Sequence, residues 1–179
     1  MIKVISLNIN RCWTRSKPFI LELIREHKPH VVLLQETKKS RIRVQGYISI
    51  QQPPESKLEV GLVTLVRNDV IHTHINLSHL STKGMEFLGI GIPEGNNKTT
   101  HIINTYIRHN SINTAKIIEI LRLSANSYIF GDLNCKLDIP QHNHPNSNGI
   151  KLDAIIDQDL VAVAYPSKYT RLGRIGQTD

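Results

Sequence analysis

The chain has 179 residues, 40% of them hydrophobic, which suits one domain with a sizeable core and excludes a disordered tail. Its formal net charge of +7 is of the kind found in nucleic-acid-binding proteins, although a surplus that serves only solubility would look similar. The apolar runs are far shorter than the roughly 18 residues of a membrane span, and the first residues lack a signal-peptide pattern. We therefore expect no membrane segment.

Two cysteines occur, Cys12 and Cys135, without the paired spacing of a zinc site. We expect both to be free thiols, which fits a reducing cytosol or nucleus better than secretion.

The first part of the chain predicts a βαβ unit. Residues 2–10 are typical of a strand that ends in two asparagines, and a polar loop follows over 11–16. Residues 17–27 carry apolar side chains at helical spacing, Phe19 among them, with Pro18 suited to the first turn. Residues 30–37 then form a continuous apolar run that ends in Glu36, typical of a strand buried on both faces. We expect the two strands to be parallel neighbours or near-neighbours.

The middle of the chain predicts shorter strands over 47–50, 60–66, 70–77 and 86–92, separated by turn signals of an antiparallel meander. Strands follow at 100–106 and 127–130, a helix at 114–123, a polar loop at 141–148, a helix at 149–158 and a strand at 160–163. This mixture predicts an α/β fold of mixed sheets covered by helices, in a single domain over 1–179.

Polar side chains stand where several of these strands end. Gly131, Asp132, Leu133 and Asn134 follow an apolar strand, and Asp132 and Asn134 point the same way into one cleft if the strand geometry persists. Loops after strand ends are where α/β proteins form ligand clefts. An Asx-turn is the structural alternative for this pair.

The ordered set of these motifs resembles the endonuclease/exonuclease/phosphatase superfamily, which includes DNase I and the apurinic/apyrimidinic endonucleases. The matching segments are Asn8-Ile9-Asn10, Gln35-Glu36-Thr37, Asn104-Thr105-Tyr106, Gly131-Asp132-Leu133-Asn134 and Tyr169-Thr170-Arg171. Their spelling looks closest to the endonuclease domains of non-LTR retrotransposons. The resemblance implies two packed mixed sheets flanked by helices, the DNase I-like four-layer sandwich.

Two positions depart from the family pattern. Arg108 stands where a proline commonly follows the motif tyrosine. The chain also ends at Asp179, a candidate for the family's late aspartate, without the Ser-Asp-His that carries the catalytic histidine. We therefore expect the fold to be incomplete at the C-terminus and the 179-residue chain to have at most trace activity.

The resemblance also implies the site residues. Glu36 is the main ligand of Mg²⁺, with Mn²⁺ as a second candidate, and its alternative is a carboxylate that caps a strand at the surface. Asn8 has a metal- and phosphate-side role and Asn10 a supporting one, unless both satisfy loop backbone. Asp132 orients the attacking water, and Asn134 donates to the phosphate.

Two further residues would lie on the substrate side. Tyr106 would stabilise the transition state, its alternative being a buried ring that only packs. Thr170 resembles the family's substrate-side threonine, its alternative being a solvent-facing loop hydroxyl.

Basic residues cluster after two of the motifs. One cluster follows Glu36 and the other follows Asn10, and at least one is expected to contact the phosphate backbone of DNA rather than form a solvated loop. The members are Lys38, Lys39, Arg41 and Arg43 in the first cluster and Arg11, Arg15 and Lys17 in the second.

The sequence thus favours a Mg²⁺-dependent endonuclease that nicks DNA by in-line attack of water on a backbone phosphate. We expect it in the nucleus or cytoplasm, fused to or acting with a reverse transcriptase in a longer parent. A lipid or inositol phosphate phosphatase of the same superfamily and an inactive DNA-binding remnant are the alternatives.

Overall fold

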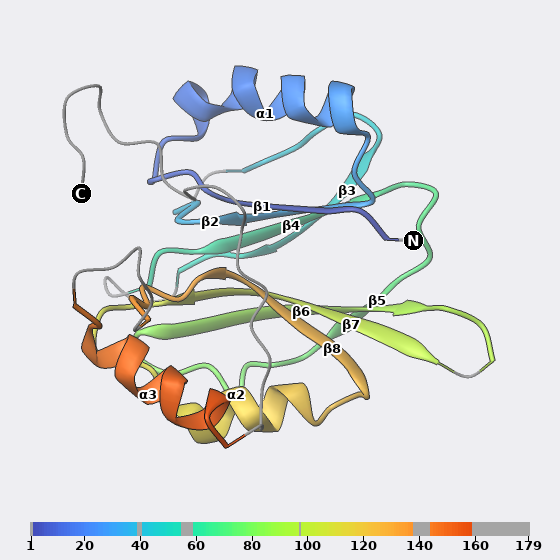
Figure 1. Cartoon of the computed structure of the whole chain (residues 1–179). Helices are drawn as coiled ribbons and strands as arrows, with labels where there is room; N and C mark the ends of the chain where they lie inside the picture. Colours follow the sequence, from blue (N-terminus) through green and yellow to red (C-terminus); the bar gives the residue numbers. More distant parts are fainter. Residues whose placement is uncertain (1, 39–40, 55–58, 97, 138–143, 159–179) are drawn as a thin grey trace.

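The structure is a computed structural model that describes residues 2–38, 41–54, 59–96, 98–137 and 144–158. Lys39, Thr170, Asp179 and the strand expected at 160–163 lie outside these ranges. Two β-sheets pack face to face, with one helix over the first sheet and two over the second (Figure 1). The expected four-layer α/β sandwich is confirmed.

The first sheet is built from β1 (Val4–Asn8), β2 (Val31–Gln35), β3 (Tyr47–Gln52) and β4 (Leu62–Arg67), in the order β1-β2-β4-β3. β1 and β2 are parallel neighbours, as the βαβ pattern predicts, while β4 runs antiparallel to both β2 and β3. Every residue of β2 is buried, which explains its continuous apolar sequence.

The second sheet contains β5 (Thr73–Ile75), β6 (Met85–Pro93), β7 (Thr99–Ile107) and β8 (Asn126–Asp132), in that order. Strands β5 to β7 pair antiparallel, and β8 pairs parallel with β7. The prediction of one continuous meander is wrong, because the chain leaves the first sheet after β4 and enters the second at β5. Alternating strands and turns fix the strands but not the sheet in which each one pairs.

Helix α1 (Trp13–His27) covers the first sheet and begins four residues earlier than predicted. Pro18 therefore lies inside the helix rather than in its first turn. Trp13 packs against the apolar cluster under α1, and Ile20 is buried there. Phe19, one of the apolar side chains at helical spacing, is 53% exposed and lies outside the buried face of the helix.

Helices α2 (Thr114–Leu121) and α3 (Ser147–Ile156) cover the second sheet (Figure 1). Ile117 and Ile120 of α2 and Leu152 and Ile155 of α3 enter the core beneath it. α3 begins within the expected polar loop because Asn146 caps it, its side-chain oxygen accepting a hydrogen bond from the amide of Gly149 at 2.8 Å.

Apolar side chains fill the space between the two sheets, among them Leu33 and Val66 from the first and Ile90 and Ile102 from the second. None of the described helices is long and apolar enough to cross a membrane.

Candidate active site

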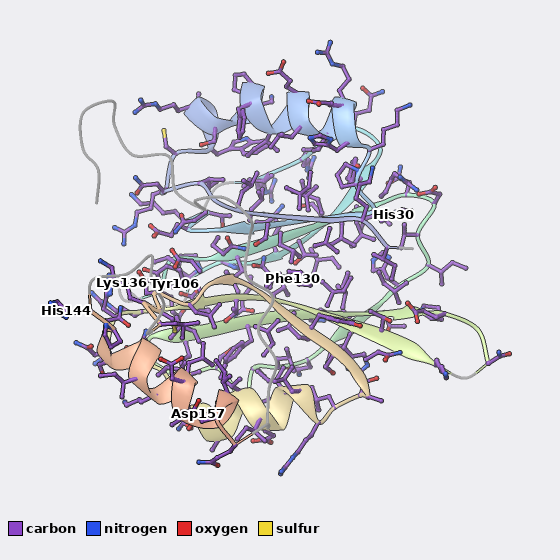
Figure 2. The ribbon with its side chains drawn as sticks, viewed as in Figure 1. His30, Tyr106, Phe130, Lys136, His144 and Asp157 are labelled. Atoms are coloured by element: carbon purple, nitrogen blue, oxygen red, sulfur yellow. The ribbon has the colours of Figure 1, made fainter. Side chains whose placement is uncertain are left out.

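The motif residues meet at one end of the sandwich because both parallel pairs finish there. Asn8 pairs with Gln35 at the ends of β1 and β2, and Tyr106 pairs with Asp132 at the ends of β7 and β8. Figure 2 shows Tyr106 at the end of the molecule opposite His30, which directly precedes β2. The site thus combines strand ends from both sheets.

Asn8 links the two carboxylates of the site. Its Nδ2 donates hydrogen bonds to Glu36 Oε1 at 3.0 Å and to Asp132 Oδ2 at 2.7 Å. Its Oδ1 accepts from the backbone N–H of Asn10 at 2.8 Å, which fixes the direction of the amide. In this arrangement Asn8 holds the carboxylates together across the two sheets, and Asn10 supports it through its backbone.

Glu36 is also in contact with a cation. Arg11 Nε lies 3.1 Å from Glu36 Oε2, and the Arg11 amide donates to the Glu36 carbonyl at 2.9 Å. The Glu36 side chain is only 14% exposed. The sequence placed Arg11 in a DNA-binding cluster but gave no sign of this contact. The contact depends on the left-handed φ angles of both residues, which the sequence pattern does not reveal.

The sequence pattern suggested that Asp132 and Asn134 share a strand face, but in the structure they do not. β8 ends at Asp132, and Asn134 has a φ of 47°, so the strand geometry is broken between them. The backbone N–H of Asn134 donates to Asp132 Oδ1 at 3.0 Å, which forms the Asx-turn expected as the structural alternative. Because Oδ2 of the same carboxylate binds Asn8, the turn orients Asp132 toward the site.

Gly131 is required by the close approach of β8 to β7. Its φ is 141°, and a Cβ built at this position would lie 1.9 Å from the carbonyl oxygen of Thr105. Any side chain would therefore push the end of β8, and Asp132 with it, away from Tyr106.

Tyr106 is 8% exposed, and its pKa is raised. Burial is the main cause, and the negative charges of Glu36 and Asp132 act in the same direction. The charge of Arg11 and a side-chain hydrogen bond with Asn134 oppose the increase. The phenol is therefore neutral at physiological pH and lies close to the carboxylates.

Gln35 and Asn104 form a buried polar link between the sheets that sequence reasoning did not assign. Gln35 Nε2 donates to Asn104 Oδ1 at 2.7 Å, and Asn104 Nδ2 donates to the carbonyls of Leu34 and Val63. Both belong to recognised motifs, Gln-Glu-Thr and Asn-Thr-Tyr, which was the available signal. They fix the strands that present Glu36 and Tyr106.

Asn146 and Asn148 form a second unassigned support, within the expected polar loop. Asn146 Nδ2 donates to the Asn134 carbonyl at 2.8 Å. The fully buried Asn148 donates to the carbonyls of Arg108 and Leu133. These amides connect the start of α3 to the loops after β7 and β8.

Of the first basic cluster, Lys38, Arg41 and Arg43 are described and exposed. Lys38 and Arg41 line a groove of about 230 Å³ that also contacts Thr37, directly after Glu36. The structure therefore places cations beside the site.

Within the described ranges, no three His, Cys, Asp or Glu side chains are close enough to form a metal cluster. The donor set nevertheless fits Mg²⁺, which is usually held by one or two carboxylates with water and substrate oxygens. Oxygens of Glu36 and Asp132 converge on one nitrogen of Asn8. Glu36 would be the main ligand, with Asp132 and Asn8 beside it.

A sequence model of the endonuclease/exonuclease/phosphatase family matches residues 5–178. The chain belongs to this family. The family resemblance inferred from the sequence motifs is thereby confirmed. A comparison with proteins of curated function found no match.

Solved structures of nucleic-acid enzymes share the fold. The endonuclease domain of TRAS1, a telomere-specific non-LTR retrotransposon, superposes with a TM-score of 0.64 at 16% identity, over 88% of this chain and 71% of that domain. The AP endonuclease LMAP of Leishmania major gives 0.69 at 15% identity, over 88% of this chain and 66% of that protein. The 3′ phosphatase NExo of Neisseria, bound to a product DNA hairpin, gives 0.58 at 12% identity, over 88% and 71%.

Proposed function

We propose that this chain is a Mg²⁺-dependent phosphodiesterase that nicks DNA, of the kind found in non-LTR retrotransposons. The family comprises hydrolytic nucleases and phosphatases. The main support for the proposal is that Asn8, Glu36 and Asp132 converge from both sheets. Two carboxylates joined by one amide, beside a neutral tyrosine, suit the hydrolysis of a phosphodiester.

Each side chain has a distinct part in this proposal. Glu36 holds the ion, which when bound supplies positive charge that polarises the phosphate. Asp132 accepts a hydrogen bond from the attacking water and orients it. Tyr106, whose raised pKa keeps the phenol protonated, donates a hydrogen bond to a phosphate oxygen, and Asn134 donates an amide N–H to the phosphate.

DNA is favoured over a small phosphorylated substrate because exposed cations lie beside the site. Arg11, Lys38, Arg41 and Arg43 can each neutralise a backbone phosphate. A TDP2 structure from D. rerio with a single-stranded DNA product also shares the fold, with a TM-score of 0.52 at 12% identity. We extend the proposal to Lys39 and Thr170 as substrate-binding residues.

Mn²⁺ is the second candidate for the ion. The retrotransposon assignment implies that the domain is fused to, or acts with, a reverse transcriptase. The two free cysteines support a nuclear or cytoplasmic location.

The test is Mg²⁺-dependent nicking of supercoiled plasmid, an assay in which one cut relaxes a whole molecule and slow reactions are detected. We expect slow nicking that Glu36→Gln abolishes at equal folded fraction, because the amide keeps the shape of the carboxylate but loses its charge. Equal nicking by both proteins contradicts the assignment of Glu36.

Asp132→Asn separates chemistry from binding. We expect its single-turnover rate to fall much more than its DNA affinity. Salt-dependent DNA binding without any nicking selects the binding-remnant alternative. Release of phosphate from inositol phosphates, with DNA left intact, selects the phosphatase.

A further inference from the structure

We propose that Glu86, a buried carboxylate outside the recognised motifs, is a positioning residue that sets the conformation of the turn carrying Glu36. The inference rests on the proposed function, because it concerns the ion that Glu36 would hold. It assigns a role to a side chain from the second sheet that does not reach the reacting atoms.

Glu86 is 2% exposed and points from β6 toward the first sheet. Its direct partner on β7 is Tyr106, and partners in an antiparallel pair project from the same face. Leu88, two residues further along β6, packs with Tyr106 and with Val60 and Leu62 of the first sheet. Glu86 therefore lies in the layer between the sheets.

Both carboxylate oxygens of Glu86 are bound by the segment that leads into β4. Oε1 accepts from the amide of Val60 at 2.8 Å, and Oε2 accepts from the amide of Gly61 at 2.9 Å. These two N–H groups offset part of the cost of burying the carboxylate.

The carbonyl groups of the same two residues accept hydrogen bonds from the turn after β2. The carbonyl of Gly61 accepts from the amide of Thr37 at 3.1 Å, and the carbonyl of Val60 accepts from the amide of Lys38 at 2.6 Å. The Val60–Gly61 peptide group thus connects Glu86 to the turn, because its N–H binds Glu86 Oε2 and its carbonyl accepts from the amide of Lys38. Hydrogen bonds in series polarise one another in a low-dielectric interior.

The turn itself needs this support. Glu36 and Lys38 both have left-handed backbone conformations, with φ of 54° and 51°. Such angles are unfavourable for residues other than glycine and persist only where surrounding contacts enforce them. Gly61 also has a positive φ of 82°, and a Cβ there would lie 2.7 Å from the Lys38 carbonyl oxygen. The two segments are packed without room for a side chain.

The two N–H contacts of the Glu86 carboxyl group argue against a role in packing alone. Burial raises its pKa most strongly, while the two backbone hydrogen bonds oppose that increase. A neutral side chain would fill the same space without the cost of burying a charge. Each N–H faces its own carboxylate oxygen, whereas a glutamine in the same position would turn its NH₂ group toward one of the two N–H donors.

The test compares Glu86→Gln with the parent and with Phe87→Leu. Phe87 is the next residue on β6, but its side chain packs with Ile117 beneath the helices, so its truncation weakens the core without touching Val60 or Gly61. Two readouts are needed: amide hydrogen exchange of Thr37 and Lys38 without metal, and Mn²⁺ affinity measured by electron paramagnetic resonance.

At equal folded fraction, we expect Glu86→Gln to accelerate exchange selectively at Thr37 and Lys38 and to weaken Mn²⁺ binding about tenfold, within the range known for groups that orient metal ligands. Phe87→Leu should change neither readout beyond its effect on global stability. Unchanged exchange at both amides, or the same changes in Phe87→Leu, overturns the role of Glu86.

Gly61→Ala provides a second variant in case Glu86→Gln does not fold. It keeps the carboxylate but disturbs the same turn, so it should also weaken Mn²⁺ binding, and unchanged affinity in the folded variant overturns the inference. Glu36→Gln separates the two proposals. If it binds Mn²⁺ as tightly as the parent does, the proposed function fails, while hydrogen exchange still decides whether Glu86 positions the turn.

Discussion

Arg11 contacts Glu36 twice, through its backbone amide at 2.9 Å from the Glu36 carbonyl and through its guanidinium at 3.1 Å from the Glu36 carboxylate. The backbone contact joins the loop after β1 to the turn after β2. The side-chain contact places the positive guanidinium beside the carboxylate that we propose as the ligand of the divalent ion. Arg11 would therefore compete with the ion for Glu36, and its guanidinium would be available to a phosphate when an ion is bound.

Arg11→Ala should tighten Mg²⁺ binding by about two- to fivefold at low ionic strength, the scale of an exposed ion pair, while DNA binding weakens. The backbone contact is kept, so Glu36 stays in place. Isothermal titration with Mg²⁺ and fluorescence anisotropy with labelled DNA measure the two effects.

Arg15→Ala is the matched control, because it removes the same charge from an exposed position on α1. It should leave Mg²⁺ affinity unchanged. Weaker Mg²⁺ binding by Arg11→Ala would show that the guanidinium orients Glu36 instead of competing for it.

Neutralising Lys38, Arg41 and Arg43 together should weaken DNA binding for all sequences and reduce its salt dependence. Each lost phosphate contact lowers the slope of log affinity against log salt by about 0.9 on duplex DNA. Binding measured over a series of salt concentrations gives the slope.

A control triple variant replaces Arg25, Lys98 and Arg122, which are exposed and belong to segments that lead into the opposite ends of the strands. It changes the net charge equally and should keep the slope of the parent. Equal slopes in all three proteins would support the alternative that the first cluster belongs to a solvated loop and does not contact DNA.

Asn104→Ala should lower the free energy of unfolding by about 2–4 kcal/mol. The change removes three buried hydrogen bonds and leaves Gln35 Nε2 without its buried acceptor. Urea denaturation followed by circular dichroism measures the loss. Asn126→Ala, at the start of β8, should cost about 0.5 kcal/mol or less, and similar losses in the two variants would refute the inter-sheet link.

The two cysteines should differ in reactivity. Burial, reinforced by the charges of Asp132 and Asp153, raises the pKa of Cys135 to about 12, so at pH 8 only about one in 10⁴ of these thiols is ionised. Cys12 is exposed. Titration with Ellman's reagent at pH 8 should show one fast and one slow thiol, and Cys12→Ser should remove the fast phase. A fast phase that survives this substitution contradicts the assignment.

The strand and helix patterns needed only local information, and they were largely correct. Alternating and continuous apolar runs identified β1, β2, β7 and β8, because burial of a strand face leaves a direct record in the sequence. The ordered motifs at their ends identified the family. The predicted start of α1 is wrong because Trp13 lies among polar residues in the sequence, and its place in the helix depends on packing against the first sheet's apolar cluster.

The sequence alone thus determined the family, the α/β class and which residues end the strands. The tertiary structure decided which of those ends meet and how their side chains point. Asn8 and Asp132 are 124 residues apart, and their contact depends on how the two sheets pack. The Asx-turn of Asp132, the Arg11–Glu36 pair and the support from Glu86 depend on backbone angles and long-range hydrogen bonds, which no local pattern of side chains encodes.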